Sequence, residues 1–222
     1  MQKYTFKECT IVKLKKALKI QQEASLSPLD YWLSMSYECS DLEKKIIETY
    51  QANLMENVDA WNEQELALNF IGPIIALAGF GREKNFNSFS ERTLSATFEE
   101  IELTGKVDGM IAAGKEEPET PYFCLQEYKR DTDPPFIPPI WGDKGGGDPK
   151  AQVLAAMLVA QKLNGSQEPI YGAYVKGRNW FFMVLVENKY CVSPQFDATQ
   201  AAVFDIFRLL VGLKLMIEKK FE

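Results

Sequence analysis

The chain has 222 residues, of which 46% are hydrophobic and 25% are charged, and its formal net charge is −6. One or two globular domains fit this length, and the composition supplies a sizeable core and excludes a largely disordered chain. The sequence contains no histidine, which excludes Ser–His–Asp triads, Cys–His pairs and histidine-based zinc sites. Acid–base chemistry near neutral pH would therefore use carboxylates, lysine, tyrosine or metal-bound water.

The cysteines and the apolar segments bear on the cellular compartment. The four cysteines are widely separated and form no CxxC motif, so neither a zinc site nor a disulfide framework is expected. No signal-peptide core follows the N-terminal lysines, and no apolar run approaches the 18 residues that a membrane-spanning helix needs. We therefore expect a soluble, cytoplasmic protein with reduced thiols and no membrane partner.

Residues 1–60 are predicted to be helical and to form an extension that packs on the rest of the chain. Apolar residues between positions 11 and 20 lie roughly on one helix face, and Ser27-Pro28 is typical of a helix start. Ser40 and Glu43 have the spacing of a capping box before the next helix. The lysines of residues 11–20 are typical of a solvated helix face, and nucleic-acid or membrane binding is the alternative.

The next seventy residues change from a helical to a strand pattern. Asn62 should begin a helix that runs to Gly79, with a kink at Gly72-Pro73 because proline lacks a backbone donor. Apolar and polar residues then alternate, as is typical of half-buried strands. The predicted strands cover residues 94–98, 101–112 and 122–129, with a turn or bulge at Thr104-Gly105.

Residues 131–150 contain five prolines and four glycines, which predicts a long loop. The elements expected after it are a helix from Pro149 to Asn164-Gly165, strands at 170–175 and 180–186, and a last helix over 199–219. Strands on both sides of a crossover helix predict an α/β domain over residues 61–222, with a mixed central sheet flanked by helices.

The strand predicted at 122–129 ends on a polar pair. Its first half is apolar on both faces, as in a central strand, whereas Glu127 and Lys129 point to one face because residues two apart share it. Burying this pair is costly unless it is paired or binds something. Asp108 on the preceding strand should sit beside Glu127, so two carboxylates and an ammonium would converge at the end of the sheet. Such oxygen ligands suit Mg²⁺ or Mn²⁺, and a bound metal supplies a nucleophilic water without histidine.

These residues resemble a known family. Asp108 followed by Glu127-Tyr128-Lys129 is similar to the PD-(D/E)XK nuclease superfamily, which has the restriction-endonuclease-like fold. In that superfamily an acidic residue often lies on a helix before the sheet, as Glu65 would here. Many members also have a glutamine on the helix after the E-x-K strand, which Gln152 matches in position. The resemblance covers roughly residues 62–190.

The resemblance implies an endonuclease that hydrolyses phosphodiester bonds of nucleic acid, DNA rather than RNA, with a divalent metal. Asp108, Glu127 and Glu65 would hold Mg²⁺ or Mn²⁺, Lys129 would position or polarise the attacking water, and Gln152 would orient Lys129 or a phosphate. Many nucleases of this fold dimerise to cut two strands, so a homodimer is one possible assembly.

Two positions depart from the family's pattern. Val107 stands where the family name has proline, a variation that the family tolerates. Ala156 stands four residues after Gln152, where exonuclease-type members have tyrosine, which argues against an exonuclease.

Each site residue also has an ordinary structural interpretation. Asp108-Gly109 is a hairpin-turn signal, and Glu127 with Lys129 is compatible with an exposed ion pair on an edge strand. Glu65 completes a capping-box pattern, so it serves either the helix cap or a metal, and Glu63 is the alternative acid.

A second class of function is a non-catalytic module on the same fold that binds nucleic acid or protein. The acidic net charge favours it, because nonspecific DNA binding needs clustered positive charge. Independently of this choice, Gln152 is also compatible with an exposed helix residue. Apart from the N-terminal lysines, the candidate contacts for nucleic acid are Lys144, Lys150, Lys176 and Arg178.

Overall fold

The computed structural model describes residues 1–130 and 147–222, and a nine-stranded sheet lies at its centre. The strands are β1 (Gln2–Thr5), β2 (Gln21–Gln22), β3 (Phe86–Thr97), β4 (Ile101–Ala113), β5 (Glu119–Lys129), β6 (Ile170–Lys176), β7 (Asn179–Val186), β8 (Lys189–Val192) and β9 (Phe196–Asp197). Their order is β1-β4-β5-β6-β7-β8-β2, while β3 also pairs with β4 and β9 with β7. The sheet combines parallel and antiparallel pairs.

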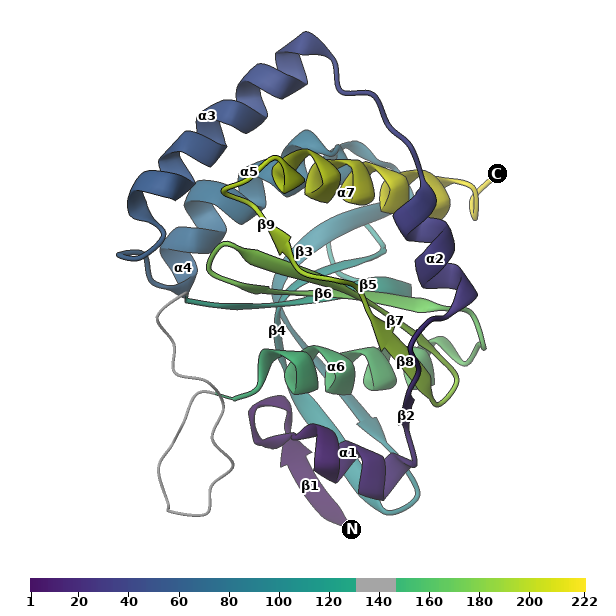
Figure 1. Cartoon of the computed structure of the whole chain (residues 1–222). Helices are drawn as coiled ribbons and strands as arrows, with labels where there is room; N and C mark the ends of the chain where they lie inside the picture. The colour runs from purple at the N-terminus through teal and green to yellow at the C-terminus, as the bar shows by residue number, and fades with distance from the viewer. Residues whose placement is uncertain (131–146) are drawn as a thin grey trace.

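Helices cover both faces of this sheet (Figure 1), so the expected α/β architecture with a mixed sheet between helices is confirmed. On one side of the sheet lie α2 (Ser27–Ser34), α3 (Asp41–Asn57), α5 (Gly72–Leu77) and α7 (Ala202–Glu218), and on the other lie α1 (Ile11–Leu18) and α6 (Pro149–Asn164) (Figure 1). Each face has its own hydrophobic cluster. Helix α6 is buried all round from Ala151 to Ala160, because every residue there except Gln152 is apolar.

The strands that carry the predicted site form one continuous unit. Strands β3, β4 and β5 are antiparallel neighbours, and β6 runs parallel to β5 after the crossover helix α6. The predictions of a turn at Thr104-Gly105 and at Asp108-Gly109 are wrong, because β4 continues through both. Gly105 instead permits a close approach, since a Cβ there would lie 2.5 Å from the ring of Phe6.

Residues 1–60 are not helical throughout, which corrects the prediction for this segment. The three expected helices are present, and Ser40 and Glu43 form the capping box of α3. Strand β1, followed by the short 3-10 turn η1 (Phe6–Glu8), pairs parallel with β4, and β2 pairs parallel with β8. Both strands are short and mostly polar, so no apolar alternation marks them. The boundary predicted at residue 60 therefore does not separate the strands of this sheet.

The helix predicted from Asn62 is interrupted close to the expected place. Asn62 caps α4 (Glu63–Leu66), the π-helical segment η2 (Ala67–Ile71) follows, and α5 begins at Gly72. Pro73 has no N–H to donate, so the turn before it widens instead of closing as an α-turn. The 3-10 turn η3 (Phe80–Arg82) then leads to β3, which begins eight residues before the predicted strand.

No helix within the described ranges has both the length and the apolar character needed to cross a membrane. All four cysteines are buried with free thiols. Burial raises the pKa of the Cys124 thiol to about 12, which leaves it unreactive at neutral pH.

Candidate functional site

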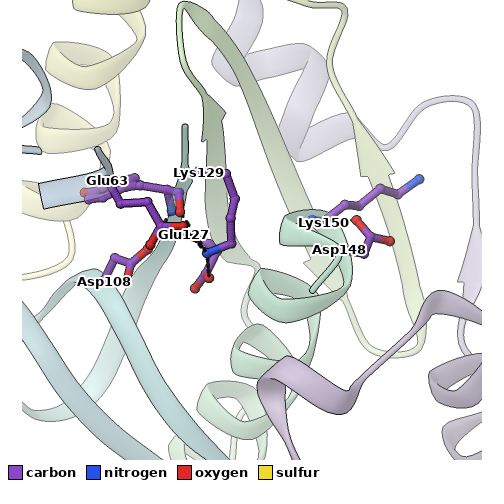
Figure 2. Close-up of polar contacts among 7 residues, drawn as sticks. Glu63, Asp108, Glu127, Lys129, Asp148 and Lys150 are labelled. Carbon is purple, nitrogen blue, oxygen red and sulfur yellow. Dashed lines mark hydrogen bonds and ion pairs between the residues drawn. The ribbon is translucent and has the colours of Figure 1, made fainter. Parts of the chain in front are cut away.

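Strands β4 and β5 bring Asp108 and Glu127 together. The two strands pair with Gly109 opposite Gln126, and the next step of this antiparallel register places Asp108 opposite Glu127. Figure 2 shows both carboxylates pointing to one region, together with Glu63 and the Lys129 ammonium. The two acids and the amine therefore converge as the sequence predicts.

The ammonium of Lys129 connects the acids of this cluster. Its Nζ donates to Glu127 Oε1 at 2.9 Å and to the Tyr128 carbonyl oxygen at 3.0 Å, and it forms an ion pair with Glu63 Oε1 at 3.1 Å. Glu127 is 4% exposed and Lys129 is 8% exposed. Strand β5 lies between β4 and β6, so a solvent-facing pair on an edge strand is excluded.

Helix α4 contributes Glu63 to the cluster, whereas Glu65 caps the helix. Glu65 Oε2 accepts from the Asn62 N–H at 2.7 Å, and the Glu65 N–H donates to the Asn62 side chain at 2.9 Å. Glu63, two residues earlier, reaches Lys129 instead. Within residues 1–130 and 147–222, no contact joins the Glu65 carboxylate to Asp108 or Glu127. The role of Glu65 as a metal ligand therefore stays a prediction.

Asp108 is held in place by the main chain of β5. Its Oδ2 accepts a hydrogen bond from the Tyr128 N–H at 2.6 Å. Burial raises the pKa of Asp108, against the opposing effects of this hydrogen bond and of the positive charges of Lys129 and Lys7. Lys7 lies on η1, and in the sequence it is one of several N-terminal lysines with nothing to link it to the site. Its position beside the site depends on the pairing of β1 with β4, which no local residue pattern predicts.

The pKa values of the cluster show an excess of negative charge. Burial and the charge of Asp108 raise the pKa of Glu127 to about 7. Burial by itself lowers the pKa of Lys129, but the surrounding carboxylates, Glu127 foremost, outweigh it and raise the pKa overall. Lys129 is therefore an ammonium at neutral pH, and three carboxyl groups share this one positive charge.

The donor set fits a divalent cation of the Mg²⁺ type. Mg²⁺ in proteins is bound by one or two carboxylates, with waters and substrate phosphates as the remaining ligands. Asp108 and Glu127 supply such carboxylates. Burial and then the charge of Asp108 raise the pKa of Glu127, and a bound cation would act against both effects. In the part of the chain that the structure describes, no group of three histidine, cysteine or acidic side chains is arranged to hold a metal. The residues therefore fit a two-carboxylate site completed by water or substrate.

Gln152 is buried at the start of α6. It is 2% exposed, and its Nε2 has no hydrogen-bond partner among the described residues. A Cβ at Gly147 would lie 2.7 Å from Gln152 Nε2 and 2.9 Å from the Lys7 carbonyl oxygen, so these three residues are close neighbours. The interpretation of Gln152 as an exposed helix residue is wrong. No hydrogen bond in the described ranges joins it to Lys129.

The structure describes three of the four basic residues predicted to contact nucleic acid, and each of the three has different neighbours. Lys150 donates to Gln22 and lies over the Tyr190 ring, and Figure 2 shows it apart from the carboxylates. Arg178 pairs with Asp59. Lys176 is next to Lys129 in the register of β5 and β6, so it is the one that the fold brings to the site. Lys144 lies outside the described residues.

Comparison with models of protein families gives no match for this sequence, and a search of curated proteins gives none either. The function is therefore inferred from the side chains of the site and from their geometry.

Replacing Glu127 with glutamine should remove a pH dependence of stability. The pKa of Glu127 rises from its ordinary value of 4.5 to about 7 on folding, so protonation favours the folded state fully below pH 4.5. This contribution is lost as the pH rises through 7. We expect wild type to lose about 3 kcal/mol of unfolding free energy from this group across that window, and Glu127→Gln to lose none of it.

Urea unfolding at pH 4.5 and pH 8 measures both values, and Glu99→Gln, at an exposed position, is the control that should follow wild type. Parallel pH profiles for wild type and Glu127→Gln would contradict the raised pKa.

Proposed function

We propose that this protein is a divalent-metal-dependent phosphodiesterase that cleaves nucleic acid, DNA in preference to RNA, as an endonuclease. The observation that carries the proposal is the cluster of half-buried Asp108 and buried Glu127 on adjacent strands, with the Lys129 ammonium between Glu127 and Glu63. Paired carboxylates hold a hard cation, and an ammonium beside them offsets the charge that develops on a phosphate.

The order of the elements supports a restriction-endonuclease-like fold. Helix α4 carries an acid ahead of the strands with the carboxylates, β4 carries Asp108, β5 carries Glu127 and Lys129, and α6 carries the buried Gln152. The resemblance of the sequence to PD-(D/E)XK nucleases rests on the same features in the same order. The structure adds that Glu63 is the acid of α4 that contacts the cluster.

Each residue of the cluster would have a separate role. Asp108 and Glu127 would hold Mg²⁺ or Mn²⁺, which when bound supplies Lewis-acid activation of water and phosphate. Lys129 keeps its proton because its pKa is raised, so it would donate a hydrogen bond to a phosphate oxygen or to the attacking water rather than accept a proton. Glu63 would hold the Lys129 ammonium in position through their ion pair.

Positive charge for the substrate backbone would come from two sides of the cluster. Lys7 is on η1, close enough to lower the pKa of Asp108 against the larger effect of burial. Lys176 is beside Lys129 on the neighbouring strand. We infer that these two side chains contact phosphates near the cleaved bond. A homodimer that would cut both strands stays a prediction.

A second candidate function is a binding module on the same fold that has no catalytic activity. Two observations favour it: the net charge is −6, and no complete three-ligand metal site is present in the described ranges. Such a module would bind nucleic acid or protein as well after the loss of a carboxylate as before. The cleavage assay below separates the two functions.

Asp108→Asn and Lys129→Ala should each lower cleavage of plasmid and linear DNA in millimolar Mn²⁺ by about 100-fold or more. The first substitution removes a metal-binding charge, and the second removes the ammonium that offsets phosphate charge. Circular dichroism should show an unchanged fold. Lys162→Ala is the matched control, because Lys162 is exposed in the last turn of α6, and it should retain cleavage within about twofold. Equal cleavage by wild type and both variants would refute the assignment, and no cleavage by wild type would leave the binding module as the function.

Glu63→Gln and Glu65→Gln should separate the two acids of α4. Glutamine can complete a capping box in place of glutamate, so Glu65→Gln should keep its fold and its cleavage rate within about twofold. Glu63→Gln weakens the ion pair that holds Lys129 and should lower kcat about tenfold. Rates of DNA cleavage in Mn²⁺ check both variants. A larger loss in Glu65→Gln than in Glu63→Gln would assign the metal-site role to Glu65.

A further inference from the structure

A cleft of about 680 Å³ lies beside the carboxylate cluster, between the helical segment α4–α5 and strands β3 and β4. Glu63 and Asp108 belong both to the cluster and to the lining of the cleft. Pockets of 300–1,000 Å³ are the size that takes one small organic group. The cleft therefore has room for a part of the substrate that adjoins the reacting phosphate.

One wall of the cleft is apolar and belongs to the helical segment. It is made by Ala67, Leu68, Pro73, Ile75 and Ala76. Leu68 is 67% exposed, so its side chain is accessible to a ligand in the cleft. This wall includes part of the π-helical segment η2, and such widened turns occur often at functional sites.

The opposite wall is polar and belongs to β3 and β4. Ser88 and Ser90 are two residues apart on β3, so their hydroxyl groups share one face of the strand. Glu91, next to them, has a left-handed φ of 54° although it is not glycine. Strained residues of this kind concentrate at ligand sites.

The charge of the cleft limits what can occupy it. Its lining includes the acids Glu63, Glu91 and Asp108, and no lysine or arginine among the described residues that form it. A phosphate in the cleft would face like charge without a counterion. Among the parts of a nucleic acid strand, the apolar wall and the serine hydroxyls therefore fit the uncharged nucleobase and not the phosphate.

We propose that this cleft binds an unpaired nucleobase of the strand whose phosphodiester lies at Asp108, Glu127 and Lys129. This inference rests on the proposed nuclease function. The ring would pack against the apolar helix wall, and Ser88 and Ser90 would hydrogen-bond to its edge. Bases inside an uninterrupted duplex cannot reach such a cleft without leaving the stack. The preferred substrate is therefore single-stranded nucleic acid or a duplex with an unpaired nucleotide.

The test uses the full chain in Mn²⁺ with three labelled DNA oligonucleotides of matched sequence: a paired duplex, the same duplex with one bulged nucleotide, and the single strand. We expect kcat/KM at the unpaired positions to exceed that of the paired duplex by about tenfold or more. Ala76→Trp, which fills the cleft from an exposed helix position, should reduce kcat/KM on the bulged and single-stranded substrates about tenfold. Ala52→Trp, at an exposed position of α3, is its control and should match wild type.

A second pair of variants removes a side chain instead of adding one, so its result does not depend on whether tryptophan disturbs the packing around Ala76. Leu68→Ala removes the exposed apolar surface of the wall and should weaken the preference for unpaired positions several-fold, while Leu42→Ala should not. The pair is matched because Leu68 and Leu42 are 67% and 68% exposed. A fluorescent 2-aminopurine at the bulge should change its emission on binding to wild type but not to Ala76→Trp.

The outcomes separate the two proposals. If wild type cleaves DNA but treats paired and unpaired positions alike, the base-binding cleft is refuted and the nuclease function stands. If Ala76→Trp and Leu68→Ala both behave as wild type, the cleft does not bind the base and the inference is likewise overturned. If wild type neither cleaves nor binds any of the three oligonucleotides, the nuclease function fails and the base-binding cleft fails with it.

Discussion

On neighbouring strands, the half-buried carboxylate of Asp108 and the buried carboxylate of Glu127 lie beside a single ammonium, and the rest of the site is arranged around that excess of negative charge. The Tyr128 N–H fixes Asp108, and Lys129 is held between Glu127 and Glu63. Unpaired charges in such a place would cost several kcal/mol each, so the hydrogen bonds are needed for the fold to tolerate them. The negative charge that remains is the basis of the divalent-cation site that we propose.

The parts of this site that follow from strand periodicity could be predicted from the sequence. The shared face of Glu127 and Lys129, and the place of Asp108 on the adjacent strand, depend only on alternation and on a short connection. The capping role of Glu65 is also local, because a cap needs only its own first turn. By contrast, the contact from Glu63 to Lys129 and the position of Lys7 depend on how distant segments pack, so no residue pattern reveals them.

The N-terminal strands and Gly105 of β4 also depend on contacts between distant segments, which the sequence pattern does not reveal. Strands β1 and β2 are short and polar, and only pairing with β4 and β8 makes them strands. Gly105 has the sequence signature of a turn, but its role is to let the Phe6 ring approach the sheet. That contact anchors η1, and so places Lys7 near Asp108. The cleft could not be predicted for the same reason, since its walls come from the α4–α5 segment and from strands β3 and β4, which only the fold brings together.

The pKa of the Glu127 carboxyl tests the central claim most directly. The carboxyl carbon of Glu127 can be followed by ¹³C NMR as the pH is varied, first without divalent metal and then with Mg²⁺. An excess of buried negative charge predicts a pKa of about 7 without metal and a clear fall when Mg²⁺ is added, because the cation favours the carboxylate. A pKa near 4.5 that Mg²⁺ leaves unchanged would contradict both the electrostatics of the cluster and its proposed use as a metal site.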